Sequence, residues 1–375
     1  MNKGIVASLT FFLALSVASA EPPQGTFESA KPGYRFSFPK DHGSHPTFRT
    51  EWWYFTGQLQ SGDGKEYGYE LTFFRQGSDN PEVLKNPSRW APRHLYLAHF
   101  AMTDVQNKRF YYHDRMSREA IGRAGAKTDR LEVWIDPWRA VQEGETIHLQ
   151  AEEKPSSGKE AHGGWKIDLT LSPAKPPVIH GEDGISKKGE EEGQASHYYS
   201  FTRLQTHGSV WINGSEEKVT GASWMDHEFS SSVLNAHQVG WDWFSIQLED
   251  GSDYMFFQIR RENGEKDRAS SGTVVSPDGR SRHLTADQFT LTPVQFWKSP
   301  ASRANYPVGW KIEIPSEQLS LESQPVLPEQ ELITSKSTRI AYWEGASRFN
   351  GIKGGKPMTG KGYVELTGYA KPFNQ

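Results

Sequence analysis

One segment of this 375-residue chain occurs twice, and this repeat strongly limits what the chain can fold into. Residues 51–59 read EWWYFTGQL and residues 240–248 read GWDWFSIQL, and each segment is followed by an Asp-Gly turn and a Phe-Phe pair. Two weaker matches follow in the same order: WKID at 165–168 with WKIE at 310–313, and TGxxWxD at 220–226 with TGxxYxE at 359–365. A spacing this long exceeds the roughly 20 to 45 residues of a solenoid repeat. The repeat therefore predicts two tandem copies of one domain.

Each copy is predicted to be built from β-strands. Apolar and polar residues alternate along most of the chain, as in Glu51, Trp53 and Phe55, which is the pattern of half-buried strands. Turn signals such as Asn213-Gly214 separate the strands and favour antiparallel hairpins. Aromatic residues make up 13% of the chain although its mean hydropathy is −0.70, so large rings replace aliphatic bulk. The pattern predicts an all-β fold of two tandem antiparallel β-barrels, residues 21–232 and 233–375.

The N-terminus has the features of an export signal. Lys3 gives a short positive region, residues 5–17 are mostly apolar, and Ala18-Ser19-Ala20 is a small-residue cleavage site. The apolar stretch is shorter than the ~20 residues that span a bilayer, and no later segment is longer or more apolar. We expect cleavage after Ala20 and a soluble periplasmic or secreted protein without an integral membrane segment.

Composition and motifs exclude several classes of function. The chain has no cysteine and a net charge of −4, which excludes disulfides and thiolate metal sites and argues against nucleic acid as a partner. It lacks HExxH, a P-loop and GxGxxG. Asp226, His227 and Glu228 look like metal ligands, but alternate side chains of a strand point to opposite faces. We therefore expect neither a metal nor a cofactor.

Two carboxylates lie on faces that otherwise look apolar. Glu51 alternates with Trp53 and Phe55, and Asp242 shares a face with Phe244 and residues 246 and 248. If these faces are internal, burial raises the carboxyl pKa and can keep the acid protonated near neutral pH. The alternative is that each carboxylate bonds a nearby amide or Arg and is structural.

The second repeated hairpin carries a candidate ligand surface. If Asp250-Gly251 is a two-residue turn, Trp243 lies opposite Gln258 and Trp241 opposite Arg260. One face then holds rings and hydrogen-bonding groups, namely Trp241, Trp243, Tyr254, Gln258 and Arg260. The same face could instead be an outer surface on which Arg260 stacks over Trp241.

Two histidines are expected to be buried, His99 and His227. A lone histidine on a strand is commonly a structural group, but His227 lies beside two carboxylates and close to Trp224. His227 is therefore the stronger functional candidate.

Several segments together resemble the exported carotenoid 1,2-hydratase-like family, also called AttH-like or secreted hydrolases: HPTFRTEWWYFTGQL, LAHFAMTD, ASHYYSFTRL, WMDHEFSSS, WDWFSIQL, and YWEGA with GKGYVELTGY. The resemblance covers nearly the whole chain after residue 20. It implies two lipocalin-like (calycin) barrels in tandem.

The resemblance also implies an activity. Hydratases of the family add water to a terminal tertiary double bond of an acyclic carotenoid without a cofactor. Their histidine matches His227, the aromatic residue after it matches Phe229, and a tyrosine matches Tyr254. The position of their acid is Phe256, which cannot donate a proton. Either Asp226, Asp242 or Asp253 replaces that acid, or the protein is no hydratase.

The predicted site lies near the junction of the two copies, because ligands favour domain interfaces. Asp226 and His227 are the predicted acid–base pair, Asp242 a second candidate acid and Tyr254 a polar anchor. The predicted ligand wall consists of Glu51, Trp52, Trp53, His99, Trp224, Trp241, Trp243 and Arg260. The predicted partner is a small hydrophobic, isoprenoid- or lipid-like molecule, acted on by a hydratase or lyase. The alternatives are a non-catalytic carrier of such a molecule and a secreted hydrolase.

Overall fold

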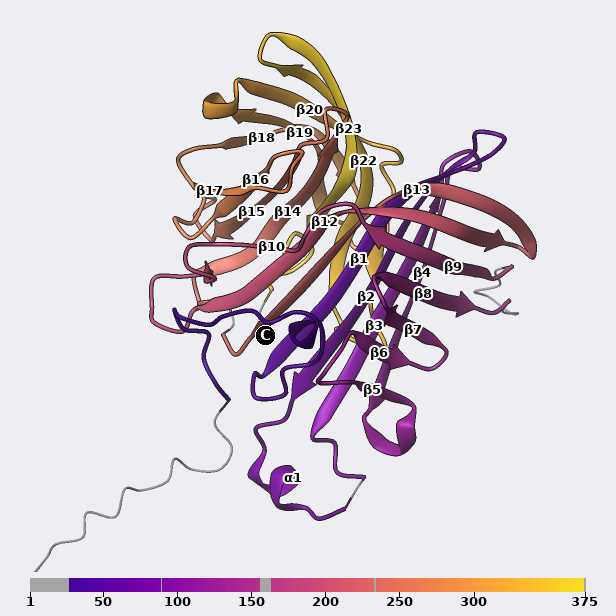
Figure 1. Ribbon diagram of the computed structural model, residues 1–375, viewed down its shortest axis with the longest axis vertical. Coiled ribbons are helices and arrows are strands. Elements are labelled where there is room, and N and C mark those ends of the chain that lie inside the picture. Colours follow the sequence, from indigo (N-terminus) through magenta and orange to yellow (C-terminus); the bar gives the residue numbers. More distant parts are fainter. Residues whose placement is uncertain (1–26, 89, 156–162, 233, 374–375) are drawn as a thin grey trace, which may run out of the picture.

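The computed structural model describes residues 27–88, 90–155, 163–232 and 234–373 (Figure 1). The predicted signal peptide lies outside these ranges. In the described part, helical structure is confined to four short segments: α1 (Pro81–Lys85), η1 (Lys40–His42), η2 (Ala120–Gly122) and η3 (Pro315–Glu317). None of them has the length or apolar composition needed to cross a bilayer.

The first half of the chain forms one antiparallel sheet that curls nearly into a barrel (Figure 1). Its strands run in the order β4-β3-β2-β1-β13-β12-β9-β8-β7-β6-β5, and β6 also contacts β2, β3 and β4 across the gap. Two short strands pair with β12 beside this path. The strands are β1 (Thr50–Ser61), β2 (Glu66–Gly77), β3 (His94–Asp104), β4 (Arg109–Arg118), β5 (Ala124–Ala126), β6 (Glu132–Ile135), β7 (Trp138–Glu143), β8 (Thr146–Glu153), β9 (Trp165–Pro173), β10 (Val178–Ile179), β11 (Ser186–Lys187), β12 (Ala195–Ile212) and β13 (Ser215–Ser230).

The second half forms a half-barrel that stays open between its two edge strands, β17 and β18. Its order is β17-β16-β15-β14-β23-β22-β20-β19-β18, with β21 paired to β22. The strands are β14 (Gln238–Leu248), β15 (Asp253–Arg261), β16 (Ser271–Val275), β17 (Ser281–Thr285), β18 (Thr290–Lys298), β19 (Asn305–Ile314), β20 (Leu319–Pro325), β21 (Glu331–Ile333), β22 (Ala341–Lys353) and β23 (Lys356–Leu366). The predicted all-β class with two tandem barrel-like sheets is confirmed.

The two sheets share one connectivity. Each opening strand, β1 or β14, lies between its hairpin partner and the last strand of its sheet, β13 or β23. The repeats at 51–59/240–248 and 220–226/359–365 therefore fall on equivalent strands. The WKID/WKIE match does not. In the first sheet β9 is directly paired with β12, whereas in the second sheet β20 lies between β19 and β22, the equivalent of β12. The prediction that these two segments are equivalent was therefore wrong. Because the first sheet ends at Ser230 and the second begins at Gln238, we propose a domain boundary in this connection.

The two sheets pack against each other with equivalent faces. Along β1, Trp53 and Phe55 point into the core of the first barrel, whereas Tyr54 belongs to an aromatic cluster shared with the second sheet. Tyr54 of β1 lies opposite Asp226 of β13, and at the equivalent position of the second sheet Trp243 of β14 lies opposite Glu365 of β23. Side chains alternate across a strand, so one strand serves both the barrel core and the contact between sheets.

The predicted register of the second hairpin was wrong by one residue. The turn comprises three residues, 249–251, rather than only Asp250-Gly251, because the Leu248 amide donates to the Ser252 carbonyl at 2.9 Å. Trp243 therefore lies opposite Phe257 and Trp241 opposite Ile259. A slip of one residue moves every side chain to the other face, which separates the two tryptophans from Tyr254, Gln258 and Arg260.

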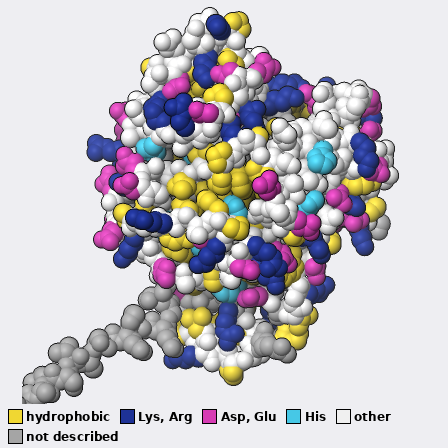
Figure 2. Space-filling view, in the orientation of Figure 1, with side chains coloured by type: hydrophobic (Ala, Val, Ile, Leu, Met, Phe, Trp, Pro, Cys, Tyr) yellow, Lys and Arg dark blue, Asp and Glu magenta, His cyan; other side chains and the backbone are white. Residues whose placement is uncertain are grey.

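On the face seen in Figure 2, charged side chains of both signs surround an area where apolar side chains gather, in the region of β10. Ile179 of β10 is 40% exposed, and β10 is paired with the part of β12 that holds Tyr199 and Ser200. The apolar area therefore lies close to where the two sheets meet.

Candidate functional site

The contact between the two sheets contains four carboxyl groups that form no ion pair with any described residue. They are Glu70 on β2, Asp226 on β13, Glu344 on β22 and Glu365 on β23. The first three are buried, with 1%, 4% and 1% of their surface exposed, and Glu365 is partly exposed. Burial without a cation disfavours the charged form of a carboxyl group.

Asp226 is held by three hydrogen-bond donors. Tyr198 Oη donates to Oδ2 at 2.7 Å, Trp224 Nε1 donates to Oδ1 at 2.6 Å, and Ser200 Oγ also donates to Oδ1. Trp243 Nε1 in turn donates to Tyr198 Oη at 3.1 Å. These bonds favour the carboxylate, but burial outweighs them and raises the pKa of Asp226 to about 7. A group with this pKa can both give and take a proton near neutral pH.

The neighbouring acids are protonated at neutral pH. Burial raises the pKa of Glu70 to about 8. Burial, and then the nearby carboxyls of Glu365 and Glu70, hold the pKa of Glu344 well above its usual range. Tyr54 Oη donates to Glu344 Oε1 at 2.5 Å. The contact between the sheets therefore holds several carboxyl groups with raised pKa beside aromatic side chains.

A pocket of ≈ 300 Å³ lies at the same contact between the sheets, but none of the four acids lines it. Its wall includes Thr56, Gln58, Trp224, Ser245, Gln247 and Tyr363. Trp224 donates to Asp226, and Thr56 lies opposite Glu70 in the β1–β2 register. The pocket volume is at the low end of the ~300–1,000 Å³ typical of small-molecule sites.

A serine and a histidine extend the network behind Asp226. His180 Nε2 lies 2.6 Å from Ser200 Oγ, and its Nδ1 lies 2.8 Å from Thr273 Oγ1. Burial lowers the pKa of His180 to about 3, so the ring is neutral. Ser200 lies between the histidine and the carboxyl, whereas a serine hydrolase places the histidine between the serine and the carboxylate. The order of these groups does not fit that catalytic triad.

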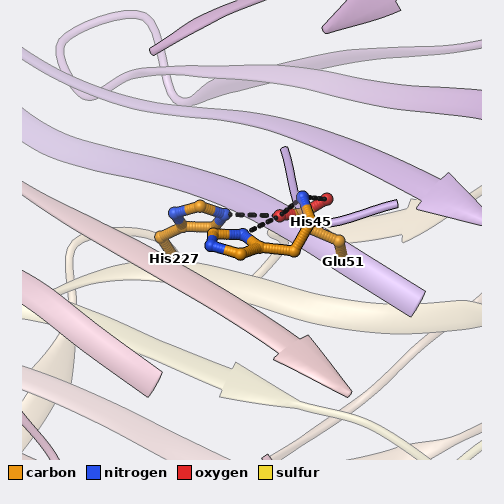
Figure 3. A group of neighbouring side chains, drawn as sticks. All are labelled: His45, Glu51 and His227. Carbon is orange, nitrogen blue, oxygen red and sulfur yellow. Dashed lines mark hydrogen bonds and ion pairs between the residues drawn. The ribbon is translucent and has the colours of Figure 1, made fainter. Parts of the chain in front are cut away.

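The structure separates Asp226 from His227, the predicted acid–base pair, because consecutive residues of β13 face opposite sides. His227 lies inside the first barrel, where its Nε2 is 2.9 Å from Glu51 Oε1 and its ring stacks on Trp53 at 4.8 Å between centroids. His45 Nδ1 approaches the same oxygen at 2.8 Å (Figure 3). Arg75 Nε pairs with the other oxygen of Glu51 at 2.9 Å. Glu51 is thus a charged group, and its pKa lies well below the usual range because these partners outweigh burial.

Three other predicted residues lie on the inner face of the second sheet. Asp242 is ion-paired with Arg260 and accepts a bond from Tyr369 Oη at 2.9 Å. The guanidinium of Arg260 lies over the ring of Tyr369 at 3.8 Å rather than over Trp241. Tyr254 belongs to the apolar core of this sheet. The predicted surface of Trp241, Trp243, Tyr254 and Arg260 is therefore divided between two faces of the sheet.

The remaining predicted residues border the contact between the sheets. Trp52 and Trp241 are partly buried and pack on its aromatic cluster. His99 Nδ1 lies 2.7 Å from Tyr342 Oη, and its Nε2 lies 2.9 Å from Ser337 Oγ. Burial lowers the pKa of His99 to about 4, so this ring is a neutral link between the two halves of the chain.

Sequence reasoning missed Glu70, Glu344, Tyr54 and Tyr198, although one signal was present. The repeat already matched Asp226 with the glutamate at 365, so a carboxyl at the same position in both copies pointed to a shared face. The partners come from strands far apart in the sequence, and only the packing of the two sheets brings them together.

The sequence profile of the AttH-like family matches residues 29–369. The chain belongs to this family. The crystal structure of an AttH protein from Nitrosomonas europaea is similar at 33% identity, with a TM-score of 0.80, over 92% of this chain and 100% of that one. Kievitone hydratase from Nectria haematococca shares the fold at 15% identity, with a TM-score of 0.66, over 90% of this chain and 93% of that one. No functionally curated protein matches the sequence significantly.

Proposed function

We propose that this AttH-like protein is a cofactor-independent hydratase or lyase that acts on a small hydrophobic alkene, isoprenoid- or lipid-like, bound between the two sheets. The observation that carries the proposal is Asp226, a buried carboxyl whose pKa of about 7 suits proton transfer. It accepts a hydrogen bond from Trp224, which lines the pocket, and is linked to Trp243 through Tyr198. One protein with the same fold is by name a hydratase, but that likeness concerns the fold, so the argument rests on Asp226.

The proposed reaction conserves atoms and charge. The protonated carboxyl of Asp226 gives its proton to one alkene carbon, and the π electrons form the new C–H bond. The positive charge on the other carbon lies near the rings of Trp224 and Trp243, whose faces attract cations. Water attacks this carbon, and its extra proton returns to the Asp226 carboxylate. The net change is the addition of one water, and the reverse sequence is dehydration.

A specific contact favours an enzyme over a carrier. In a simple carrier, the carboxyls beside the ligand are expected to be neutralised by ion pairs. Here Asp226 and Glu344 each accept a hydrogen bond from a buried tyrosine, Tyr198 and Tyr54. Such pairs of protonatable groups are arranged for proton transfer rather than for passive binding.

The test follows oxygen from water. Protein incubated with alkenes that carry a terminal isoprenoid double bond in H₂¹⁸O should give an alcohol labelled with ¹⁸O, detected by mass spectrometry. Asp226→Asn, which cannot supply the proton, should lower the rate by at least 10²-fold. Asp168→Asn on β9 is the control and should match the unmodified protein. Wild-type-like turnover by Asp226→Asn would contradict the proposal.

A further inference from the structure

A second polar cluster lies inside the first barrel, on the opposite side of β13 from Asp226. It comprises His45, Glu51 and His227, and one possible ligand atom of each lies within 4.8 Å of those of the other two (Figure 3). We propose that these three residues bind a divalent transition-metal ion of the zinc class. The sequence predicted no metal because only neighbours within residues 226–228 were considered, whereas the partners of His227 come from β1 and the loop before it.

The distances suit coordination. His45 Nδ1 lies 2.8 Å and His227 Nε2 lies 2.9 Å from Glu51 Oε1. Ligands that bind Zn²⁺ at about 2.1 Å in tetrahedral geometry stand about 3.4 Å from one another, so the two rings need to move back from Oε1 by roughly 0.5 Å. Both nitrogens therefore lie close to the distance from Oε1 that neighbouring ligands have, and an ion can bind with small shifts of the two rings.

Each ligand is oriented by an outer partner. His45 Nε2 lies 3.4 Å from Asp41 Oδ1, and His227 Nδ1 lies 3.1 Å from Tyr199 Oη. Metal-binding histidines almost always bond a carboxylate or another polar group through their second nitrogen. These contacts leave His45 Nδ1 and His227 Nε2 directed at a common point.

The carboxylate is also fixed from behind. Glu51 Oε2 accepts bonds from Arg75 Nε at 2.9 Å and Ser44 Oγ at 2.7 Å, while Oε1 faces the two histidine rings and also accepts the backbone N–H of His45 at 2.9 Å. Arg75 thus holds the carboxylate without occupying the oxygen that faces the proposed ion. Two imidazoles and one carboxylate form a set that zinc uses in sites with an open fourth position.

The proposed site is accessible from one side. Glu51 and His227 have no exposed side-chain surface, whereas the side chain of His45 is 12% exposed. An ion can therefore enter past His45. Binding replaces the two histidine hydrogen bonds to Oε1 with coordinate bonds. The proton on His227 Nε2 moves to Nδ1, where it donates to Tyr199, and the proton on His45 Nδ1 is released to solvent, while His45 Nε2 keeps a proton that faces Asp41.

The test uses the full mature protein without an affinity tag, because a histidine tag binds the same ions. Titration calorimetry with Zn²⁺ should show one ion per chain, and Co²⁺ should give the visible absorption bands of a site with protein ligands. His45→Ala should weaken Zn²⁺ binding at least 100-fold and abolish the Co²⁺ bands. His148→Ala, a histidine on β8 outside the cluster, should behave like the unmodified protein.

A further variant separates loss of coordination from loss of folding. Asp41→Asn keeps all three ligands and should weaken Zn²⁺ binding roughly 10- to 100-fold, as outer partners do, while circular dichroism remains unchanged. Absence of one-to-one binding in the unmodified protein, or equal binding in His45→Ala, would overturn the proposal. The readout is binding alone, so the result is independent of the hydratase proposal.

Discussion

At the scale of single residues, the environment of each acid decides its protonation. Asp226 and Glu51 are both buried carboxyls, yet the first has neutral donors and the second has Arg75 and two histidines. Burial dominates for Asp226 and raises its pKa, whereas the charged partners dominate for Glu51 and lower it. The sequence predicted that an acid would lie on an apolar face, but the partners that set its charge come from distant strands.

Tyr198 is the residue through which the pKa of Asp226 can be tested. Tyr198→Phe removes a donor that stabilises the carboxylate, so the pKa of Asp226 should rise. The protonated form is active in the proposed hydration, and activity should fall as pH rises through this pKa. The falling limb of kcat/KM against pH should therefore shift upward by about one pH unit, since a hydrogen bond to a charged group contributes ~1.5–3 kcal/mol.

Tyr254→Phe is the control, because Tyr254 lies in the core of the second sheet. In this variant the falling limb of kcat/KM against pH should stay at the pH of the unmodified protein. An unshifted limb in Tyr198→Phe would show that Asp226 does not control the rate.

At the scale of elements, alternation predicted the strands well but fixed the register poorly. In the β14–β15 hairpin, a two-residue turn and a three-residue turn both suit Asp250-Gly251, and their registers differ by one residue, so that they bring opposite faces together. Both faces of β1 and β14 are largely buried, so hydrophobicity alone could not choose between them. The error moved Tyr254 and Arg260 onto the wrong side of the sheet.

Asp253 at the start of β15 is predicted to be a structural clamp rather than an acid catalyst. It pairs with Lys175 at 2.6 Å and Arg203 at 2.6 Å, and thereby ties the first sheet to the second. Asp253→Ala leaves the buried Lys175 ammonium without a charged partner, with only the Gly251 carbonyl still bonded to it, and should cost ~3–5 kcal/mol of unfolding free energy. Denaturant titration measures this loss, with the exposed Asp129→Ala as control. A loss below ~1 kcal/mol would show that the clamp contributes little.

At the scale of the whole molecule, the duplication explains both the fold and the place of the candidate site. The repeat at residues 51 and 240 correctly predicted the two opening strands, because both need large rings on either face. It could not predict that the two copies pack through these equivalent faces, which brings Asp226, Glu344 and Glu70 together. Contacts between sheets depend on packing that no local pattern encodes.

The central claim is that the acids between the sheets keep their protons near neutral pH, and the pH dependence of stability tests it. Glu70 has a folded pKa of about 8 against about 4.5 when unfolded. A raised carboxyl pKa makes the unfolded state release protons first, so stability falls as pH rises toward the folded value. Buried histidines with lowered pKa, such as His99 and His180, act in the opposite direction up to about pH 7.5, but they are the same in the unmodified protein and in a Glu70 variant and cancel in the difference between the two. His45, whose pKa is raised, acts in the same direction as the acids.

The decisive measurement is therefore the unfolding free energy from pH 6.5 to 8.5 in the unmodified protein and in Glu70→Gln, which resembles the protonated acid. The unmodified protein should lose stability across this range. Glu70→Gln should be more stable than the unmodified protein by about 2–3 kcal/mol already at pH 6.5, because only the unmodified protein gains free energy by ionising residue 70 on unfolding, and it should lose less on going to pH 8.5, by roughly 1 kcal/mol per pH unit. Parallel curves for the two proteins would mean that Glu70 is ionised between the sheets and would contradict the account.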